Sequence, residues 1–294
     1  MRKRRYVLKT LATLPFLAIA PSLFARTIEE DCFRLKTSLN AFSFNGPLSK
    51  GNINLFQVID YCVEQNFDAI DITGYYFPEY PKVPSDEYIF AIKKKAQDLG
   101  LEISGTGVRN DFTSPDKAKR NEHIQVVKNW IEVAQKLGAP VIRIFAGGGI
   151  PDGYTWEQTA GWMIEDFKEC LAHGKKHGVV VAVQNHNDFI RTPEHVHDLF
   201  EKVDDPWFGL IMDTGGYRNG NTYDDIAETI KYAVNWQIKE KIFVKGIEMD
   251  TDIEKLMSVI KKSCYKGYIP IETLGDSDVG EKVKALMSQI RKHL

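Results

Sequence analysis

The residues best suited to chemistry are concentrated where one apolar run ends. Val179–Val183 leads directly into Gln184, Asn185 and His186. An apolar run of this length predicts a strand that is buried on both faces, as in a parallel sheet. Open α/β sheets and barrels carry their functional groups at the C-terminal ends of such strands. We therefore expect this polar cluster to line a functional site, with His186 and Gln184 on the same face of the strand.

Other predicted strands also end in polar side chains. Asp213 lies in the predicted strand Gly209–Thr214, where it either contributes to the site or starts a turn. Glu272 lies in an otherwise apolar strand, and a buried carboxylate needs a partner. Candidate contacts to a substrate are Asn45, Tyr75, Arg109, Arg143, His186 and Tyr217. The arginines could bind oxyanions or form salt bridges to Asp71 or Asp111, and the tyrosines could stack on a ring of the ligand or pack in the core.

Strand and helix signals alternate after residue 34, and eight strands are predicted. They cover Leu35–Phe44, Phe67–Thr73, Leu101–Gly107, Pro140–Ala146, Val179–His186, Gly209–Thr214, Lys241–Ile247 and Tyr268–Leu274. Between them, apolar residues recur at helical spacing. Eight βα repeats in ~270 residues match a (β/α)8 TIM barrel. The alternative, an open doubly wound sheet, would usually carry a Gly-rich turn after the first strand, and Ser43–Pro47 does not match one.

The amino terminus has the layout of a signal peptide. The basic segment Arg2–Lys9 precedes the apolar segment Leu11–Ala20, and small residues follow up to Ala25. The apolar segment is too short to span a bilayer as a standard helix. Arg4–Lys9 resembles the twin-arginine export signal, which implies export to the periplasm; an ordinary secretory leader or an uncleaved anchor are the alternatives. We predict a leader over residues 1–25 and a single barrel domain over residues 26–294.

The net charge argues against one class of partner, and the spacing of the cysteines argues against two kinds of structural framework. Without residues 1–25, which hold five basic residues and no acid, 33 Lys+Arg face 40 Asp+Glu, a net charge near −7. Such a charge argues against a nucleic-acid partner, because phosphate contacts need concentrated Lys and Arg. The four cysteines lie far apart without a CxxC pair, which argues against a zinc ribbon or a disulfide framework.

Three motifs resemble the xylose-isomerase-like TIM barrels, the superfamily of sugar phosphate isomerases and epimerases. Ala182–Asp188 resembles its hydrophobic-Glu-Asn-His-x-Asp stretch on strand five, Gly209–Gly215 its strand-six Asp motif, and Ile269–Glu272 its strand-eight Glu. The similarity covers roughly residues 35–290. It implies a carbohydrate substrate and a divalent metal such as Mn, Mg, Co or Zn. In that family the metal is held by a Glu on strand five, an Asp on six, a His on seven and a Glu on eight.

The sequence departs from that pattern at two of the four ligands. Gln184 stands in place of the strand-five Glu, and the predicted strand seven, Lys241–Ile247, contains no His. The resemblance still implies a metal held by Gln184, Asp213 and Glu272, because oxygen ligands suit hard cations. Alternatively, Lys245 could pair with both carboxylates and leave the site without a metal. A third possibility is a catalytically inactive barrel that binds carbohydrate.

The glutamine at position 184 also limits which proton transfers the site could catalyse. In ketose 3-epimerases, the glutamates on strands five and eight act from opposite faces of the carbon next to a carbonyl. Gln184 cannot take a proton near neutral pH. The catalytic candidates are therefore Glu272 or Lys245 as the base, with His186 as an acid or orienting group. We expect an isomerase-like or epimerase-like enzyme that removes a proton α to a carbonyl of a sugar or keto-sugar. The alternative is a metal-dependent lyase or dehydratase that acts on oxidised sugars.

Overall fold

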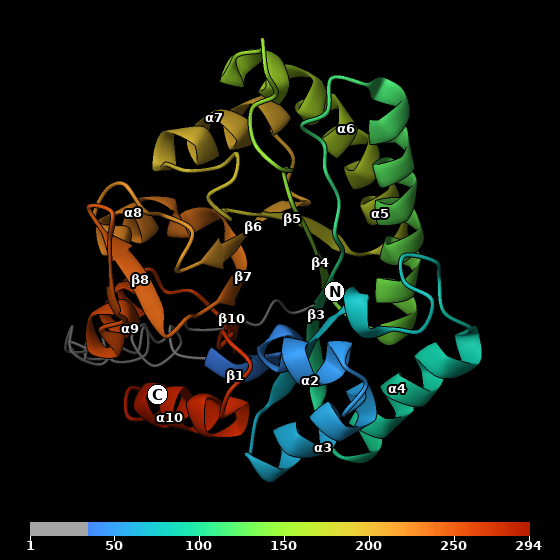
Figure 1. Ribbon diagram of the computed structural model, residues 1–294, viewed down its shortest axis with the longest axis vertical. Coiled ribbons are helices and arrows are strands. Elements are labelled where there is room, and N and C mark those ends of the chain that lie inside the picture. Colours follow the sequence, from blue (N-terminus) through green and yellow to red (C-terminus); the bar gives the residue numbers. More distant parts are fainter. Residues whose placement is uncertain (1–34) are drawn as a thin grey trace, which may run out of the picture.

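The computed structural model describes residues 35–294, and it confirms the predicted TIM barrel. Eight parallel strands form one sheet in the spatial order β10-β1-β2-β3-β4-β5-β6-β7. The ring closes between β7 and β10 through Ile238, whose backbone N–H donates to the carbonyl of Pro270 at 2.9 Å and whose carbonyl accepts from Glu272 N–H at 2.8 Å. Figure 1 looks onto this ring of strands, with the helices arranged around its outside.

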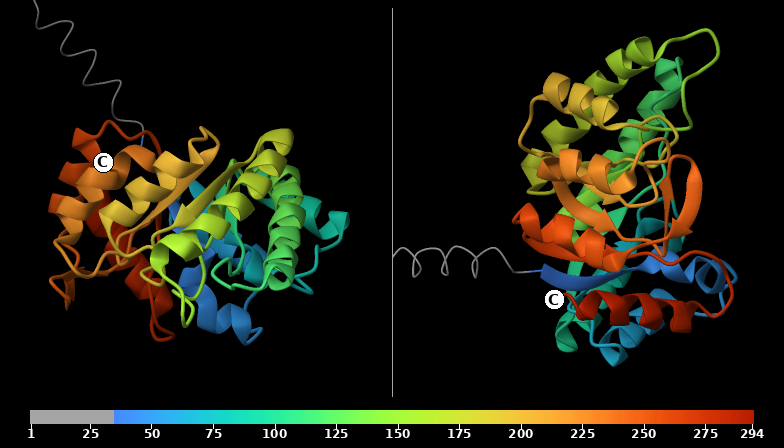
Figure 2. Two further views of the ribbon diagram at one scale, coloured as in Figure 1. Left: turned by 90° about the horizontal axis from the view of Figure 1, so that it is seen from above. Right: turned by 90° about the vertical axis from the view of Figure 1, so that its left-hand side faces the viewer.

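Each barrel strand is followed by helical structure on the outer side. The barrel strands are β1 (Leu35–Asn40), β2 (Ala69–Thr73), β3 (Glu102–Gly107), β4 (Val141–Ile144), β5 (Val180–Gln184), β6 (Phe208–Asp213), β7 (Ala233–Gln237) and β10 (Gly267–Ile271). The α-helices are α2 (Asn45–Ser49), α3 (Leu55–Glu64), α4 (Asp86–Asp98), α5 (Lys117–Leu137), α6 (Trp156–His177), α7 (Pro193–Val203), α8 (Thr222–Thr229), α9 (Ile253–Lys262) and α10 (Val279–Arg291). Short 3-10 helices are η1 (Ala41–Phe44), η2 (Gly74–Tyr76) and η3 (Ile230–Tyr232). Figure 2 shows this helical layer from two further sides.

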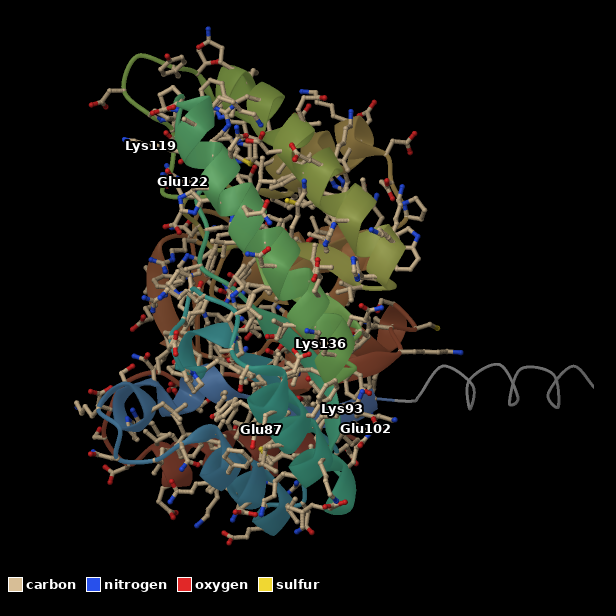
Figure 3. All side chains as sticks on the ribbon, turned by 90° about the vertical axis from the view of Figure 1, so that its right-hand side faces the viewer. Glu87, Lys93, Glu102, Lys119, Glu122 and Lys136 are labelled. Carbon is tan, nitrogen blue, oxygen red and sulfur yellow. The ribbon has the colours of Figure 1, made fainter. Side chains whose placement is uncertain are left out.

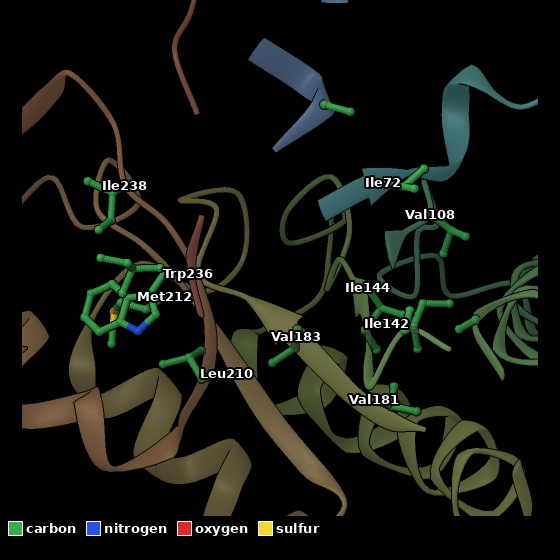
Figure 4. Close-up of a cluster of buried hydrophobic side chains, with 14 of the residues drawn as sticks. Ile72, Val108, Ile142, Ile144, Val181, Val183, Leu210, Met212, Trp236 and Ile238 are labelled. Atoms are coloured by element: carbon green, nitrogen blue, oxygen red, sulfur yellow. The ribbon is translucent and has the colours of Figure 1, made fainter. Parts of the chain in front are cut away.

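The main hydrophobic core lies between the strands and the helices. Because strand side chains alternate, Val181, Val183 and Leu210 point outward and are fully buried against the helices (Figure 4). Apolar residues that recur at helical spacing on α5, among them Val127 and Ile131, are buried in the same core. The alternation leaves the inward-facing positions of each strand for the interior of the barrel, where polar groups can gather.

Helix ends follow the signals in the sequence. The Thr192 hydroxyl caps α7 by accepting from the backbone N–H of His195 at 3.4 Å, with Pro193 as the first helical residue. Gly138 and Gly178 end α5 and α6 in the left-handed conformation, with φ of 81° and 68°. Glycine adopts that conformation without steric cost, so these local signals set where β4 and β5 begin.

The predicted position of strand seven is wrong. The barrel strand is Ala233–Gln237, whereas Lys241–Val244 (β8) pairs antiparallel with Ile247–Asp250 (β9) in a separate two-stranded sheet. The true strand is hard to detect because Asn235 and Gln237 are polar yet buried inside the barrel. Asn235, for example, donates to a carboxylate oxygen of Asp71 at 3.3 Å. Polar residues satisfied across the barrel therefore interrupt the apolar pattern that marks a buried strand.

Several expectations concern the leader, the membrane and the cysteines. The predicted leader, residues 1–25, and the domain boundary after it lie outside the described residues. Within residues 35–294, no helix combines the length and the apolar character needed to cross a membrane. Cys62 and Cys170 are buried free thiols, whereas Cys264 is disulfide-bonded, which the cysteine spacing did not predict.

Candidate active site

Polar side chains converge at the C-terminal ends of the barrel strands, as the sequence predicts. Gln184 is the last residue of β5 and faces the barrel interior. Asp213 and Gln237 end β6 and β7 and are paired in register. Glu272 directly follows β10. The resulting group, called here the carboxylate–amide cluster, consists of Gln184, Asp213, Gln237 and Glu272.

Asp213 is the most extensively hydrogen-bonded member of the cluster. Its Oδ2 accepts from the Lys239 ammonium at 2.7 Å and from the Gln184 amide at 2.7 Å. Its Oδ1 accepts from the backbone N–H of Gly215 at 2.9 Å. Burial acts to raise the pKa of Asp213, but Lys239 and the hydrogen bonds outweigh burial and lower the pKa below its ordinary value. Asp213 is therefore ionised and held in place.

Lys239 makes the pairing with both carboxylates that the sequence analysis offered, as an alternative to a metal, for Lys245. Its Nζ lies 2.7 Å from Asp213 Oδ2 and 3.5 Å from Glu272 Oε1, and its side chain is 12% exposed. Burial lowers the pKa of Lys239, but the two carboxylates raise it by more, so the ammonium stays charged. Lys245 is instead exposed between β8 and β9 and outside the barrel sheet, because the segment assigned to strand seven forms that hairpin.

Gln184 contributes an amide whose orientation is set by its neighbours. Its Nε2 donates to Asp213 and also to Gln237 Oε1 at 2.6 Å, and both of these atoms are acceptors. The residue is 3% exposed, and its Oε1 has no hydrogen-bond partner within residues 35–294. Buried polar atoms nearly always have a partner. This buried oxygen is therefore an exception among the polar atoms of the site.

A cavity, called here the barrel cavity, opens above the cluster. Its deep part is lined by Asn40, Arg143, Gln184, Gln237 and Glu272. Its outer part has a volume of about 370 Å³ and is lined by Arg109, Asn110, Gly147, Gly148 and Asp188. Both parts share the wall residues Phe42, Tyr75, Phe145 and His186. The deep part, with its polar floor, has a volume of about 50 Å³, so the outer part with its aromatic wall provides the room for a small molecule.

Arg143 brings a fixed positive charge to the deep part of the cavity. The residue is 5% exposed and lies on β4. Its guanidinium donates to the carbonyl of Val108 at 2.9 Å and to the Tyr75 hydroxyl, and it lies 4.2 Å from the ring centre of Phe145. These contacts hold the guanidinium in one orientation. It can therefore stabilise negative charge on a ligand oxygen without first having to be ordered.

His186 forms part of the cavity wall. It lies in the loop after β5, and its side chain is 43% exposed. Its Nδ1 lies 2.7 Å from Asp188 Oδ2, and its ring meets the Phe145 ring edge-on with the centres 5.0 Å apart. Because Asp188 engages Nδ1, Nε2 is the ring nitrogen left to contact a ligand.

The structure separates two predicted substrate contacts from the barrel cavity. Strand β1 ends at Asn40, four residues before the predicted end, so Asn40 lies in the deep part instead of Asn45. Asn45 accepts a hydrogen bond from the Tyr76 hydroxyl at 2.9 Å in a neighbouring surface cavity. Tyr217 is fully buried and paired with Thr229 at 2.9 Å, so it has no surface to offer a sugar. Tyr75, Arg109, Arg143 and His186 do line the barrel cavity.

Sequence reasoning missed several residues of the site. They are Asn40, Phe42, Phe145, Gln237 and Lys239. Gln237 and Lys239 could have been found if the segment around the buried Trp236 had been considered as a strand. Asn40 follows the predicted start of the first strand by five residues, and only the observed turn into η1 shows that the strand ends there.

The carboxylate–amide cluster does not fit a divalent cation. Both oxygens of Asp213 already accept hydrogen bonds, and the Lys239 ammonium contacts Asp213 and Glu272 together. Gln184 turns its amide nitrogen, not its oxygen, toward Asp213. The predicted ligand set of Gln184, Asp213 and Glu272 is thus engaged by an ammonium and an amide. Within residues 35–294, the His, Cys, Asp and Glu side chains grouped closely enough for a metal are Glu132, His173 and His177, on α5 and α6 outside the barrel.

A larger cavity, of about 570 Å³, lies at the opposite end of the barrel near Lys93, Glu102 and Tyr268. Figure 3 labels Lys93 and Glu102 on this side of the molecule. Lys93 donates to the carbonyl of Lys136 at 3.0 Å, and Glu102 forms a salt bridge with Lys36 at 2.7 Å. These charged groups are paired with other parts of the protein, and TIM barrels carry their chemistry at the other end. We therefore assign the candidate active site to the barrel cavity.

Comparisons with known proteins agree with the fold. The sequence profile of the xylose isomerase-like TIM barrel family matches residues 59–293. D-psicose 3-epimerase from Clostridium cellulolyticum H10, solved with D-tagatose, superposes with a TM-score of 0.71 at 15% identity, over 88% of this chain and 99% of that chain. The probable 3-DHS dehydratase AsbF from Bacillus anthracis superposes with a TM-score of 0.69 at 16% identity, over 87% and 98%.

A third similar structure contains a metal. The IOLI protein, solved with a bound zinc atom, superposes with a TM-score of 0.68 at 18% identity, over 88% of this chain and 96% of that chain. Similarity at these identities shows the fold alone. The search of curated proteins found no significant match to this sequence.

Proposed function

This chain belongs to the xylose isomerase-like TIM barrel family, and we propose that it is an enzyme that removes the proton α to a carbonyl group of a sugar or keto-sugar. One observation carries the proposal. A single buried carboxylate, Glu272, lines the same deep cavity as Arg143 and His186. A base beside groups that stabilise an oxyanion is the arrangement that enolisation requires. The sugar epimerase among the similar structures supports the same class of substrate.

Glu272 is the proposed base. Burial raises its pKa above the ordinary value, although Lys239 acts in the opposite direction. A raised pKa strengthens a carboxylate as a base, while the nearby ammonium keeps enough of it ionised to act. The predicted alternative base, Lys245, is exposed and is not among the residues that line the cavity.

Arg143 and His186 are proposed to stabilise the negative charge that develops on the carbonyl oxygen. Arg143 is held by Val108 and Tyr75, so its N–H groups are already oriented when charge appears. His186, oriented by Asp188, is the candidate for returning a proton or protonating a leaving hydroxyl. Phe42, Tyr75 and Phe145 offer apolar faces to a sugar ring.

The cluster favours one-base chemistry over epimerisation by two bases. Gln184 cannot accept a proton, so Glu272 is the one carboxylate among the deep lining residues. Glu272 can return the proton on the same face to the former carbonyl carbon, while a proton moves from the neighbouring hydroxyl oxygen to the carbonyl oxygen, which gives isomerisation. Alternatively, a protonated His186 can deliver a proton to the original carbon from the opposite face while Glu272 keeps the proton it removed, which gives epimerisation. A second candidate outcome is elimination of a β-hydroxyl group, with His186 as the acid. The probable dehydratase among the similar structures supports this second outcome.

The test is a screen of ketoses, keto-glycosides and oxidised sugars in deuterium oxide, followed by NMR and mass spectrometry. We expect one or more compounds to gain a single deuterium at the carbon next to the carbonyl. A product whose mass differs from the substrate only by the exchanged deuterium identifies an isomerase or epimerase. A product that has lost one water molecule identifies a dehydratase. Sugar binding without exchange in any compound would contradict the proposal and favour a catalytically inactive carbohydrate-binding barrel.

We further propose that the protein is exported to the periplasm by the twin-arginine route. The motif within Arg4–Lys9 supports export, and the disulfide at Cys264 supports an oxidising compartment. A variant with Arg4→Lys and Arg5→Lys is expected to remain in the cytoplasm when cells are fractionated. In exported protein denatured without reductant, a maleimide should label Cys62 and Cys170 but not Cys264. Normal export of the double variant would indicate an ordinary secretory leader instead.

A further inference from the structure

We propose that the ammonium group of Lys239 takes the place of a divalent cation in the barrel, so that this member of the family binds and turns over its substrate without a metal. The metal-binding part of this inference is independent of the proposed function, and the turnover part rests on it. The inference follows from the contacts of the two carboxylates, from charge balance and from the way Lys239 is anchored.

Asp213 has little left to offer a metal ion. Asp213 Oδ2 accepts from both Lys239 and Gln184, each at 2.7 Å, and Asp213 Oδ1 accepts from Gly215 N–H at 2.9 Å. Lys239 Nζ is also 3.5 Å from Glu272 Oε1. A single ammonium thus bridges the two acids that a cation would need to bridge. A metal could take Asp213 Oδ2 as a ligand only if the ammonium and the Gln184 amide nitrogen left that oxygen.

The net charge of the buried groups also disfavours a divalent cation at this site. The carboxylates of Asp213 and Glu272 with the ammonium of Lys239 carry one net negative charge. Adding a divalent cation would turn this into one net positive charge in a site where Asp213 is 1% and Glu272 5% exposed. Buried charge without a partner is strongly unfavourable, and Arg143 already adds a positive charge to the same cavity. Together with Arg143, Lys239 already balances the two acids, so a divalent cation would leave an excess of positive charge in the site.

The side-chain amides of Gln184 and Gln237 stand beside the carboxylates where a metal site would need further ligands. Gln184 Nε2 bridges Asp213 and Gln237 Oε1, so each amide stands at a strand end beside the carboxylates and adds no charge. An amide oxygen is a weaker ligand than a carboxylate, and Gln184 directs its oxygen away from Asp213. The amides act as hydrogen-bonding partners of Asp213 and of each other in place of ligands.

Lys239 is anchored so that its side chain stays over the carboxylates. Its backbone N–H donates to the Thr214 hydroxyl at 2.9 Å, and its carbonyl accepts from the Thr251 hydroxyl at 2.7 Å. It follows Ile238, the residue through which β7 and β10 close the barrel. The closure of the barrel therefore places the ammonium directly next to Asp213.

The first test uses wild-type protein that has been treated with a chelator. Mn²⁺ and Zn²⁺ are titrated in by calorimetry, with a His173→Ala/His177→Ala variant to remove the outer candidate group. We expect no binding in the barrel and no change in the melting temperature of the variant when metal is added. One equivalent of tightly bound Mn²⁺ or Zn²⁺ in this variant, lost again on Asp213→Asn, would overturn the inference. This result needs no knowledge of the substrate.

The second test rebuilds a metal site. In the His173→Ala/His177→Ala background, Gln184→Glu, Gln237→His and Lys239→Met together provide three carboxylates and an imidazole. We expect this variant to bind Mn²⁺ or Zn²⁺ at least ~100-fold more tightly than its parent and to melt at a higher temperature when metal is present. The matched control keeps Lys239 and carries only the two glutamine substitutions, and it should bind markedly less well. Equal binding with and without Lys239 would show that the ammonium does not exclude the metal.

Turnover separates this inference from the proposed function. Once a substrate is identified, chelator treatment should leave the wild-type rate unchanged, and added Mn²⁺ should not increase it. A rate that falls on chelation and returns with metal would overturn the inference that turnover needs no metal. The proposed removal of a proton would be unaffected by that result. Absence of deuterium exchange together with absence of metal binding would remove the proposed function and leave the assignment of Lys239 standing.

Discussion

Replacing Glu272 by Gln is expected to lower kcat/KM by about 10²–10⁴-fold, the usual contribution of a general base. The substitution keeps the size of the side chain and its contact with Lys239, but it removes the group that takes the proton. Deuterium incorporation into the substrate measures the step directly. Glu248→Gln, at an exposed position on β9, is the matched control and should leave the rate unchanged. A Glu272→Gln enzyme that retains more than half of its activity would remove Glu272 from its proposed role.

The pH dependence of kcat/KM provides a second measurement on the same residue. Burial raises the pKa of Glu272, with Lys239 opposing this effect in part. Because the base must be ionised to act, activity should fall as pH falls through this raised pKa. The loss should therefore begin at a higher pH than for an ordinary glutamate. An acid limb at or below the ordinary value would mean that another group is the base.

Replacing Lys239 by Met is expected to destabilise the fold by about 3–5 kcal/mol, because two buried carboxylates would be left together without a cation. Urea denaturation followed by circular dichroism measures the loss. Lys239→Arg keeps the charge and should cost less. Lys245→Met, at the exposed lysine of the β8–β9 hairpin, is the matched control and should change stability by less than about 0.5 kcal/mol. Equal costs at the two lysines would contradict the structural assignment.

The cost of Lys239→Met should also depend on pH. Lys239 is among the groups that hold the pKa of Asp213 below its ordinary value, so it stabilises the folded protein only while Asp213 is ionised. That stabilisation is present above the ordinary pKa of an aspartate, and it is lost as pH falls through the lowered pKa in the folded protein. The difference in stability between wild type and Lys239→Met should therefore shrink in acid. A difference that stays constant with pH would point to lost packing of the lysine stem instead.

The strands that carry the site differ in how readily the sequence revealed them. Strand β5 was detectable because Val179–Val183 is continuously apolar, and β10 because Glu272 stands out at the end of an apolar segment. Strand β7 was not detectable in this way, because Asn235 and Gln237 are polar residues that face inward. Their partners are distant in sequence: Gln237 pairs with Gln184, 53 residues away, and Asn235 with Asp71, 164 residues away.

The sequence by itself predicted the barrel fold, which the structure confirms, and it offered Glu272 as a catalytic candidate, while the resemblance to the family motif showed Gln184 in place of a glutamate. These depend on local patterns, namely apolar periodicity, helix caps and short motifs, which each segment carries on its own. Only the tertiary structure decided which lysine meets the carboxylates. The closure of β7 onto β10 brings Lys239 to Asp213 and Glu272, while Lys245 is carried out on a hairpin. Such contacts depend on which strand ends lie side by side in the folded barrel. Local sequence patterns do not predict these neighbours, because they are far apart along the chain.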